Sequence, residues 1–367
     1  MWWPRFAALS GVARSWRLTP RRLATSGAAV PSVPRLPRPL TLGTELRGKS
    51  SRSYRLAQIL SYRERPFICV YLAQDLDGHK QHVLKTIFKS EFDYQLELQE
   101  PLMGCPYLRV AVDAVPEHLL FVYDYLSDDL LHASRRKDLL VAARKRILRD
   151  ALRGLAELHG RGIVHTDIKP DNILVDIDDA RSPSPPTSGN ITATVKRVMI
   201  SDLENASAPP PGKSIKGPLL GNHMWRSPEA HVRAKVHTPA DVFSFGIVCV
   251  YVMLDMILFQ LPNSVSPDDE KLVVSYVLEK QFCYFGDGPG VAGLRAHVDP
   301  DSPWQAAFLE IMGRLIRDDN PPRPFVGWAD VADTGFRDVV GRMTRLDPAQ
   351  RITAHEALEH PWFHDVA

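Results

Sequence analysis

The chain has 367 residues, of which 45 are Lys or Arg and 43 are Asp or Glu, so its formal net charge is only +2. This balance provides no bulk field that would favour nucleic acid as a partner. The four cysteines are scattered without a C-x-x-C pair, which argues against a disulfide framework or a zinc site. The length allows one large domain or two lobes around a buried core.

The first 45 residues form a basic extension with a composition of its own. No acidic residue occurs between Met1 and Thr44, and all the charge there comes from arginines. Residues 5–17 place apolar side chains near one helical face, and residues 21–24 read RRLA, a combination typical of a mitochondrial transit peptide. Prolines crowd residues 31–39, which favours a disordered basic tail instead. Both alternatives stay open, and with them a mitochondrial or a cytoplasmic or nuclear location.

The spacing of apolar residues changes near residue 128 and predicts two structural parts. From Tyr54 to Tyr125, short β-rich runs surround one helical candidate at 91–103, so a small sheet with one helix is expected. The expected strands are 54–60, 67–73, 82–87, 108–112 and 119–125. Helical periods follow at 138–160, 241–260, 267–281, 304–317, 335–344 and 353–360. Residues 124–128 form a short connector that can act as a hinge between the two parts.

Two segments of the helical part have unusual compositions. Residues 176–195 are rich in Ser, Pro and Asp and predict an exposed insertion between two strands. The apolar run 242–261 is as long as a membrane span, but Asp241 opens it and Asp255 lies inside it. We therefore expect a helix buried in the protein core and no membrane span.

The stretch HTDIKPDNIL at residues 165–174 lies between an apolar helical segment and a short apolar strand. Asp167, Lys169 and Asn172 supply a carboxylate, an ammonium and a carboxamide on this loop. Transfer of a phosphoryl group requires a carboxylate for the attacking hydroxyl, a cation for the phosphate and oxygen ligands for magnesium. Because Mg²⁺ prefers hard oxygen donors, a second carboxylate is expected nearby, and Asp202 follows the apolar run 198–200.

In these residues the sequence resembles the eukaryotic protein kinase family. Asp167, Lys169 and Asn172 match the catalytic loop of the family, and Asp202 matches the metal-binding aspartate of its D-F-G motif. The resemblance implies that Asp167 is the catalytic base, that Lys169 lies near the γ-phosphate, and that Asn172 and Asp202 bind magnesium. The cofactors implied are ATP and Mg²⁺. The lysine at position 169, with Pro170 after it, points to Ser or Thr rather than Tyr substrates.

Further landmarks of the family follow in the same order. The S-P-E sequence that ends at Glu229 stands for A-P-E, Asp241 begins the central buried helix, and Arg351 lies where the family pairs an arginine with that glutamate. The resemblance extends over residues 54–363 and implies an α+β fold with two lobes. The lobes and their connector are an N-lobe at 54–124, a hinge at 124–128 and a C-lobe at 129–363.

The N-lobe carries the expected nucleotide site. The sequence HVLK that ends at Lys85 resembles V-A-I-K, so the resemblance implies that Lys85 binds the α- and β-phosphates. The usual partner of this lysine is a glutamate on the only helix of the lobe. Glu97 fits best by its distance from Pro106, and Glu91 and Glu100 compete with it. Tyr123 stands at the gatekeeper position before the hinge. The expected nucleotide-binding residues are Lys85, Glu97, Val70, Tyr123, Asp124 and Leu126.

The sequence departs from the family pattern at four places, one of which is Thr166 in place of the H-R-D arginine. No glycine occurs between Leu60 and Val70, where the family has its Gly-rich loop. Leu203 and Glu204 follow Asp202 in place of F-G, and Glu204 either attracts a second magnesium or stiffens the loop. Asn222 replaces a threonine, and its carboxamide is expected to bridge Asp167 and Lys169.

Three functions remain in competition. The first is a divergent Ser/Thr kinase that acts on protein substrates, and it is favoured because the lysine, both aspartates and the asparagine are all present. The second is a pseudokinase scaffold that binds a partner, with or without nucleotide. The third and least favoured is a phosphotransferase with a kinase-like fold that acts on small molecules. The oligomeric state is left open.

Overall fold

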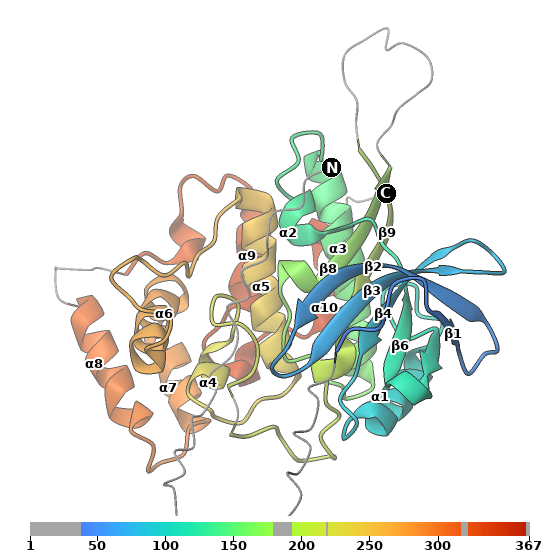
Figure 1. Cartoon of the computed structure of the whole chain (residues 1–367). Coiled ribbons are helices and arrows are strands. Elements are labelled where there is room, and N and C mark those ends of the chain that lie inside the picture. Colours follow the sequence, from blue (N-terminus) through green and yellow to red (C-terminus); the bar gives the residue numbers. More distant parts are fainter. Residues whose placement is uncertain (1–37, 179–192, 218, 317–321, 365–367) are drawn as a thin grey trace, which may run out of the picture.

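The computed structural model describes residues 38–178, 193–217, 219–316 and 322–364 and shows an α+β fold of two lobes. An antiparallel sheet with helix α1 (Phe92–Gln99) forms the smaller lobe, and helices around the buried helix α5 (Thr238–Leu254) form the larger one (Figure 1). The predicted two-lobed fold is therefore confirmed. Residues 1–37, on which the transit-peptide hypothesis rests, lie outside the described residues.

The sheet of the smaller lobe brings Lys85 to the centre of the fold. Its strands are β1 (Glu45–Arg47), β2 (Ser53–Arg63), β3 (Ile68–Asp75), β4 (Gln81–Thr86), β5 (Asp113–Val115) and β6 (Leu120–Asp124), in the order β1-β2-β3-β4-β6-β5. Alternate residues of β3 are buried, as the two-residue period of a strand requires. Lys85 on β4 lies opposite Val70 on β3 and Phe121 on β6.

Two predictions for this lobe were wrong. The domain begins before residue 54, because β1 pairs with β2 and buries Leu46 in the core beneath the sheet. The predicted strand at 108–112 is a connector, and β5 follows it. Its backbone groups bond elsewhere: Arg109 donates to the carbonyl of Ile200 in the larger lobe, and Ala111 donates to the side chain of Gln99. The amides of Arg109 and Ala111 are therefore satisfied without a strand ladder.

Helix α1 is shorter than the predicted segment 91–103. It ends at Gln99, and a 3₁₀ turn, η1 (Glu100–Leu102), continues it because Pro101 cannot extend an α-helix. The side chains that face the protein are those of Phe92, Gln95, Leu98 and Gln99. Two of these are glutamines four residues apart, so the inner face of the helix is partly polar.

The larger lobe is helical and also contains a small sheet. Its helices are α2 (Leu130–Ala133), α3 (Val141–Gly160), α4 (Pro228–His231), α5, α6 (Glu270–Phe285), α7 (Gly288–Ala296), α8 (Trp304–Ile316), α9 (Thr334–Met343) and α10 (Ala354–Leu358). Its strands are β7 (Asp128–Asp129), β8 (Ile173–Asp178) and β9 (Thr194–Ile200). The 3₁₀ turns described in this lobe are η3 (Pro170–Asn172), η4 (Leu203–Asn205), η5 (Phe325–Gly327), η6 (Pro348–Gln350) and η7 (Pro361–Phe363). Most of the predicted insertion, residues 179–192, lies outside the described residues.

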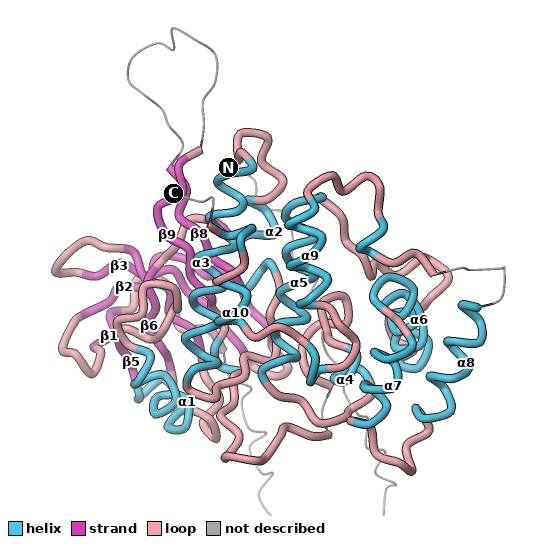
Figure 2. The backbone as a smooth tube through the Cα atoms, turned by 180° about the vertical axis from the view of Figure 1, so that it is seen from behind, coloured by secondary structure: helices cyan, strands magenta, loops and turns pink. Residues whose placement is uncertain are grey.

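Helix α5 is the centre of the larger lobe. All residues from Ala240 to Val252 are buried, which explains the apolar run by packing within the protein. Helix α3 packs against α5, α10 and β9, as Figure 2 shows from behind. Within the described ranges, no helix combines the length and apolar character that a membrane crossing requires. The loop that contains Asp167 runs between α3 and β8, and both elements contribute side chains to this core.

Candidate active site

The loop between α3 and β8 is anchored from below by one buried carboxylate. Asp241, in the first turn of α5, is 1% exposed and accepts hydrogen bonds from the backbone amides of His165 and Thr166 at 2.8 and 2.9 Å. His159 lies 3.0 Å from it through Nε2. Thr166 has a φ of 70°, a strained conformation for a β-branched residue. The two hydrogen bonds from the backbone amides to Asp241 hold this conformation. The backbone of the loop is thus fixed to the helical core.

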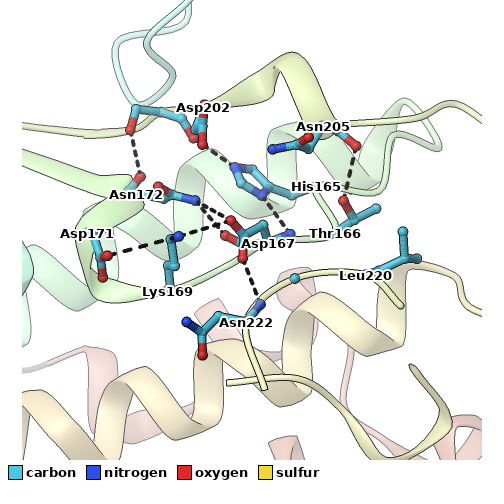
Figure 3. A network of polar contacts seen from close by, with 12 residues as sticks. His165, Thr166, Asp167, Lys169, Asp171, Asn172, Asp202, Asn205, Leu220 and Asn222 are labelled. Atoms are coloured by element: carbon cyan, nitrogen blue, oxygen red, sulfur yellow. Dashed lines mark hydrogen bonds and ion pairs between the residues drawn. The ribbon is translucent and has the colours of Figure 1, made fainter. Parts of the chain in front are cut away.

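Asp167 is the centre of a polar network on this loop (Figure 3). Asn172 Nδ2 donates to the backbone oxygen of Asp167 at 2.8 Å and to its Oδ2 at 3.2 Å. Lys169 Nζ lies 3.2 Å from the same Oδ2, and the backbone amide of Asn222 donates to Oδ1 at 3.1 Å. Burial alone would lower the pKa of Lys169, but the carboxylates of Asp167 and Asp171 raise it above its ordinary value. Both oxygens of Asp167 therefore have fixed partners.

Strand β9 delivers Asp202 to the same place. The amide of Ser201 donates to the carbonyl of Asn172 at 2.8 Å, and His165 Nε2 lies 2.8 Å from the carbonyl of Ser201. These two contacts join the end of β9 to the loop between α3 and β8. Asp202 then turns with a φ of 63°, a left-handed conformation that aspartate adopts more readily than most residues. The turn places its carboxylate beside Lys85 of the smaller lobe.

Lys85 lies between two carboxylates. Its Nζ forms an ion pair with Asp202 Oδ1 and lies 3.1 Å from Glu204 Oε2. Burial alone would lower the pKa of Lys85, but these two carboxylates raise it above its ordinary value. Burial alone would likewise raise the pKa of Asp202, and the cation of Lys85 holds it well below its ordinary range. The two lobes are thus linked through a charged cluster.

Glu229 and Arg351 form a second, more deeply buried ion pair. Arg351 donates through Nη1 to Oε1 at 2.5 Å and through Nη2 to Oε2 at 2.8 Å, the parallel geometry that suits a guanidinium and a carboxylate. The side chains are 0% and 1% exposed. The pair joins α4 to the segment before α10.

This geometry agrees with a comparison against known proteins. The sequence model of the protein kinase domain matches residues 69–363, well over half of the chain. The chain belongs to the protein kinase family. Its fold and the order of its motifs are those that the family resemblance implied.

Curated relatives of the family share about a quarter of the residues. The chain is 26% identical over 251 residues to cell division control protein 2 homolog 3 of Trypanosoma brucei brucei, across 68% of this chain and 69% of that protein. It is 26% identical over 250 residues to a probable cell division control protein 7 homolog of Encephalitozoon cuniculi, across 60% of this chain and 66% of that protein. A serine/threonine-protein kinase of Drosophila persimilis is 24% identical over 323 residues. That match covers 84% of this chain and 34% of the Drosophila protein.

One predicted member of the kinase site is wrong. Glu97 was expected to pair with Lys85, but it lies on the exposed side of α1. Gln95 and Gln99 occupy the inner face, and at 100° per residue Glu97 is turned about 200° away from Gln95. The carboxylate that accompanies Asp202 at Lys85 belongs to Glu204, from the 3₁₀ turn η4.

The hinge of the kinase domain is contacted by Arg109, a residue that the sequence prediction missed. Arg109 donates through Nε to the carbonyl of Asp124 at 2.8 Å, and its guanidinium lies 5.0 Å from the ring centre of Tyr123. A carbonyl has two lone pairs, so one acceptor site of Asp124 remains for a ligand. Within the described residues, the amide of Leu126 has no hydrogen-bond partner. The only sequence signal for Arg109 was a cation inside an apolar run.

Two further expectations concern the loops that face the cleft. Asn222 contacts Asp167 through its backbone amide, while its side-chain oxygen accepts from the amide of Met224 at 2.9 Å. The predicted carboxamide bridge to Lys169 is therefore wrong. The turn between β2 and β3 is formed without glycine, and Tyr62 packs edge-on against Phe67 across it.

The donor atoms of the cleft fit a magnesium nucleotide. Asp202 and Asn172 bring a carboxylate and a carboxamide oxygen to one place, and these are hard ligands of the kind Mg²⁺ prefers. Because Nδ2 of Asn172 is committed to Asp167, its Oδ1 is left as an acceptor, and no described residue donates to it. Lys85 and Lys169 provide cations on either side for phosphate oxygens. The residues present thus match the group that the family implies.

Proposed function

We propose that this kinase transfers the γ-phosphoryl group of ATP to a serine or threonine hydroxyl of a protein substrate, with Mg²⁺ as cofactor. The observation that carries the proposal is the position of Asp167. Its carboxylate is oriented from three sides by Asn172, Lys169 and the amide of Asn222, and it lies on the same rigid loop that touches the strand carrying Asp202. A fixed carboxylate beside phosphate-binding cations is the arrangement that phosphoryl transfer needs.

The residues have distinct tasks in this reaction. Asp167 accepts the proton of the substrate hydroxyl while the oxygen of that hydroxyl bonds to the γ-phosphorus and the bond to the ADP oxygen breaks. Lys169 neutralises charge on the transferring group, and Lys85 holds the α- and β-phosphates. When bound at Asn172 and Asp202, magnesium supplies further neutralisation of the phosphate oxygens.

Ser or Thr specificity and protein substrates rest on the family match and on Lys169. Two of the relatives quoted above are cell division control homologues, and the third carries serine/threonine kinase in its name. At about a quarter identity these names do not carry a particular substrate or pathway to this chain.

The test is labelling of a serine- and threonine-rich protein by ATP labelled at the γ-position, followed by phosphoamino acid analysis. The full chain should label Ser or Thr, and Asp167→Asn should lower the rate by about 100-fold or more, because a general base contributes that much. Asp178→Asn, an exposed carboxylate of the same lobe, is the matched control and should keep full activity.

Binding distinguishes the competing functions. Asp167→Asn should retain its nucleotide affinity, because Asp167 acts on the hydroxyl and not on ATP. Nucleotide binding without any transfer in the parent chain would favour the pseudokinase scaffold. Transfer to a small molecule but to no protein would favour the third alternative.

A further inference from the structure

The turn η4, directly after Asp202, carries a glutamate into the cleft. Both oxygens of Glu204 have partners there: the hydroxyl of Tyr123 donates to Oε1 at 2.7 Å, and Lys85 Nζ lies 3.1 Å from Oε2. A carboxylate held at both oxygens has a defined orientation. Lys85 is therefore held by a carboxylate whose other oxygen is fixed by Tyr123.

The backbone of this turn is fixed by three different parts of the fold. Gln95 of α1 donates through Nε2 to the carbonyl of Glu204 at 2.9 Å. The hydroxyl of Thr166 in the catalytic loop donates to the carbonyl of Asn205 at 3.0 Å. The side chain of Leu203, at the start of the turn, is 1% exposed within the core. Glu204 is thus presented by a turn that is tied to the helix of the small lobe, the catalytic loop and the core.

The helix that the family uses for this purpose provides no carboxylate at the lysine. Glu97 is exposed, and the inner positions 95 and 99 are glutamines. A neutral amide at position 95 is suited to its observed role, because it can donate to the backbone of the turn, which a carboxylate cannot.

Glu204 is also distinct from Asp202 in what it can do. Asp202 lies beside Asn172 and has the position of a magnesium ligand, so a bound metal competes with Lys85 for its oxygens. Glu204 contacts Lys85 through Oε2 while the hydroxyl of Tyr123 fixes Oε1, so Lys85 keeps one carboxylate partner when a metal engages Asp202. Two carboxylates at one lysine then have separate functions.

We propose that Glu204 is the positioning residue of Lys85 and takes the place that a helix α1 glutamate has in other kinases. This inference rests on the proposed function, because it assigns Lys85 to the nucleotide phosphates. It also implies that the lysine site is assembled by the turn after Asp202, without any carboxylate from α1.

The experiment compares Glu204→Gln with Glu97→Gln in the full chain. The affinity for a non-hydrolysable ATP analogue is measured by calorimetry with and without Mg²⁺, together with the unfolding midpoint, KM for ATP and kcat. Glu204→Gln should weaken analogue binding by about tenfold or more, the worth of a charged hydrogen bond, both with and without Mg²⁺. Glu97→Gln should bind like the parent. Glu204→Asp, which keeps the charge but is one methylene shorter, should also bind the analogue more weakly than the parent. It replaces Glu204→Gln in the comparison if that variant does not fold.

The possible outcomes separate this inference from the proposed function. Equal binding by Glu204→Gln and the parent, or a loss in Glu97→Gln of the same size, would overturn the role of Glu204. A loss seen only with Mg²⁺ would also overturn it, because it would identify Glu204 as a metal ligand. If Glu204→Gln weakens analogue binding while the parent transfers no phosphoryl group, the proposed function fails and the positioning of Lys85 stands.

Discussion

Arg351→Ala and Glu229→Ala should destabilise the C-lobe by different amounts. The guanidinium of Arg351 donates to both oxygens of Glu229 and also to the backbone carbonyls of Arg345, Leu346 and Pro239, at 2.6, 3.0 and 3.0 Å. Among the described residues, the carboxylate of Glu229 receives hydrogen bonds from Arg351 only. Removal of Arg351 and removal of Glu229 therefore leave different buried groups without hydrogen-bond partners.

The magnitudes follow from what remains buried. Arg351→Ala leaves an unpaired carboxylate and three carbonyls without their donor, so we expect the free energy of unfolding to fall by about 4–5 kcal/mol, the upper part of the range for breaking a buried pair. Glu229→Ala leaves the guanidinium bonded to the three carbonyls, and we expect a loss of about 3 kcal/mol. Against a total stability of about 5–15 kcal/mol, either loss is large.

Urea denaturation followed by tryptophan fluorescence measures these losses. Arg55→Ala, which breaks the exposed pair of Arg55 with Glu45, is the control and should cost no more than about 1 kcal/mol. If Arg351→Ala unfolds at the same urea concentration as Arg55→Ala, the buried pair does not stabilise the lobe. A greater loss for Glu229→Ala than for Arg351→Ala would refute the role given to the three carbonyls.

Three further predictions concern stability and rate. Burial, together with the nearby Arg226 and His223, lowers the pKa of His231 well below its ordinary value. The unfolded chain then binds a proton at this residue that the folded chain does not, so the free energy of unfolding should fall as the pH drops below about 6.5, by up to about 1.4 kcal/mol per pH unit. Denaturation curves of His231→Phe measured across this pH range should lack this contribution. Gly154→Ala should lower the free energy of unfolding by about 1–3 kcal/mol, since the added Cβ would lie 2.5 Å from the carbonyl oxygen of Tyr107. The control is Gly313→Ala, whose Cβ would meet no atom within 4 Å and which should raise the melting temperature slightly. Asp241→Asn should lower kcat by about 100-fold through a misplaced loop and leave the KM for ATP nearly unchanged, and steady-state rates would show whether it does.

The sequence predicted those parts of the fold and site that depend on local pattern. The catalytic loop could be recognised because Asp167, Lys169 and Asn172 lie within six residues on a loop between two apolar elements. The two-lobed fold followed from the change between strand-like and helix-like spacing near residue 128. In both cases the residues that decide the structure are neighbours in the chain.

The partner of Lys85 depends on which face of α1 meets the sheet, and the sequence of this helix does not show it. Its inner face carries glutamines, so its polar and apolar residues are not separated as in an amphipathic helix. The spacing from Pro106 favours Glu97 but does not show which face of the helix carries it. Glu204 lies two residues beyond Asp202, and only the fold of the turn shows that it reaches Lys85.

Other errors arose where tertiary contacts override local preference. Residues 288–296, with three glycines and a proline, have the composition of a loop, yet they form α7, which buries Val291 and Leu294 against neighbouring helices. Strand β1 is three residues long, too short to give a period, and exists because it pairs with β2. The connector 108–112 has strand-like alternation, but its Leu108 pairs with Ile200 of the other lobe.

The most direct test of the cleft is the effect of Mg²⁺ on nucleotide affinity in the parent chain and in Asp202→Asn. A non-hydrolysable ATP analogue is titrated into each protein in the calorimeter, with magnesium and with a chelator. If Lys85, Asn172 and Asp202 hold one magnesium nucleotide, the parent should bind the analogue more tightly with Mg²⁺, and Asp202→Asn should lose that gain. An affinity for the analogue that does not depend on Mg²⁺ in the parent, or a gain that is unchanged in Asp202→Asn, would contradict this arrangement.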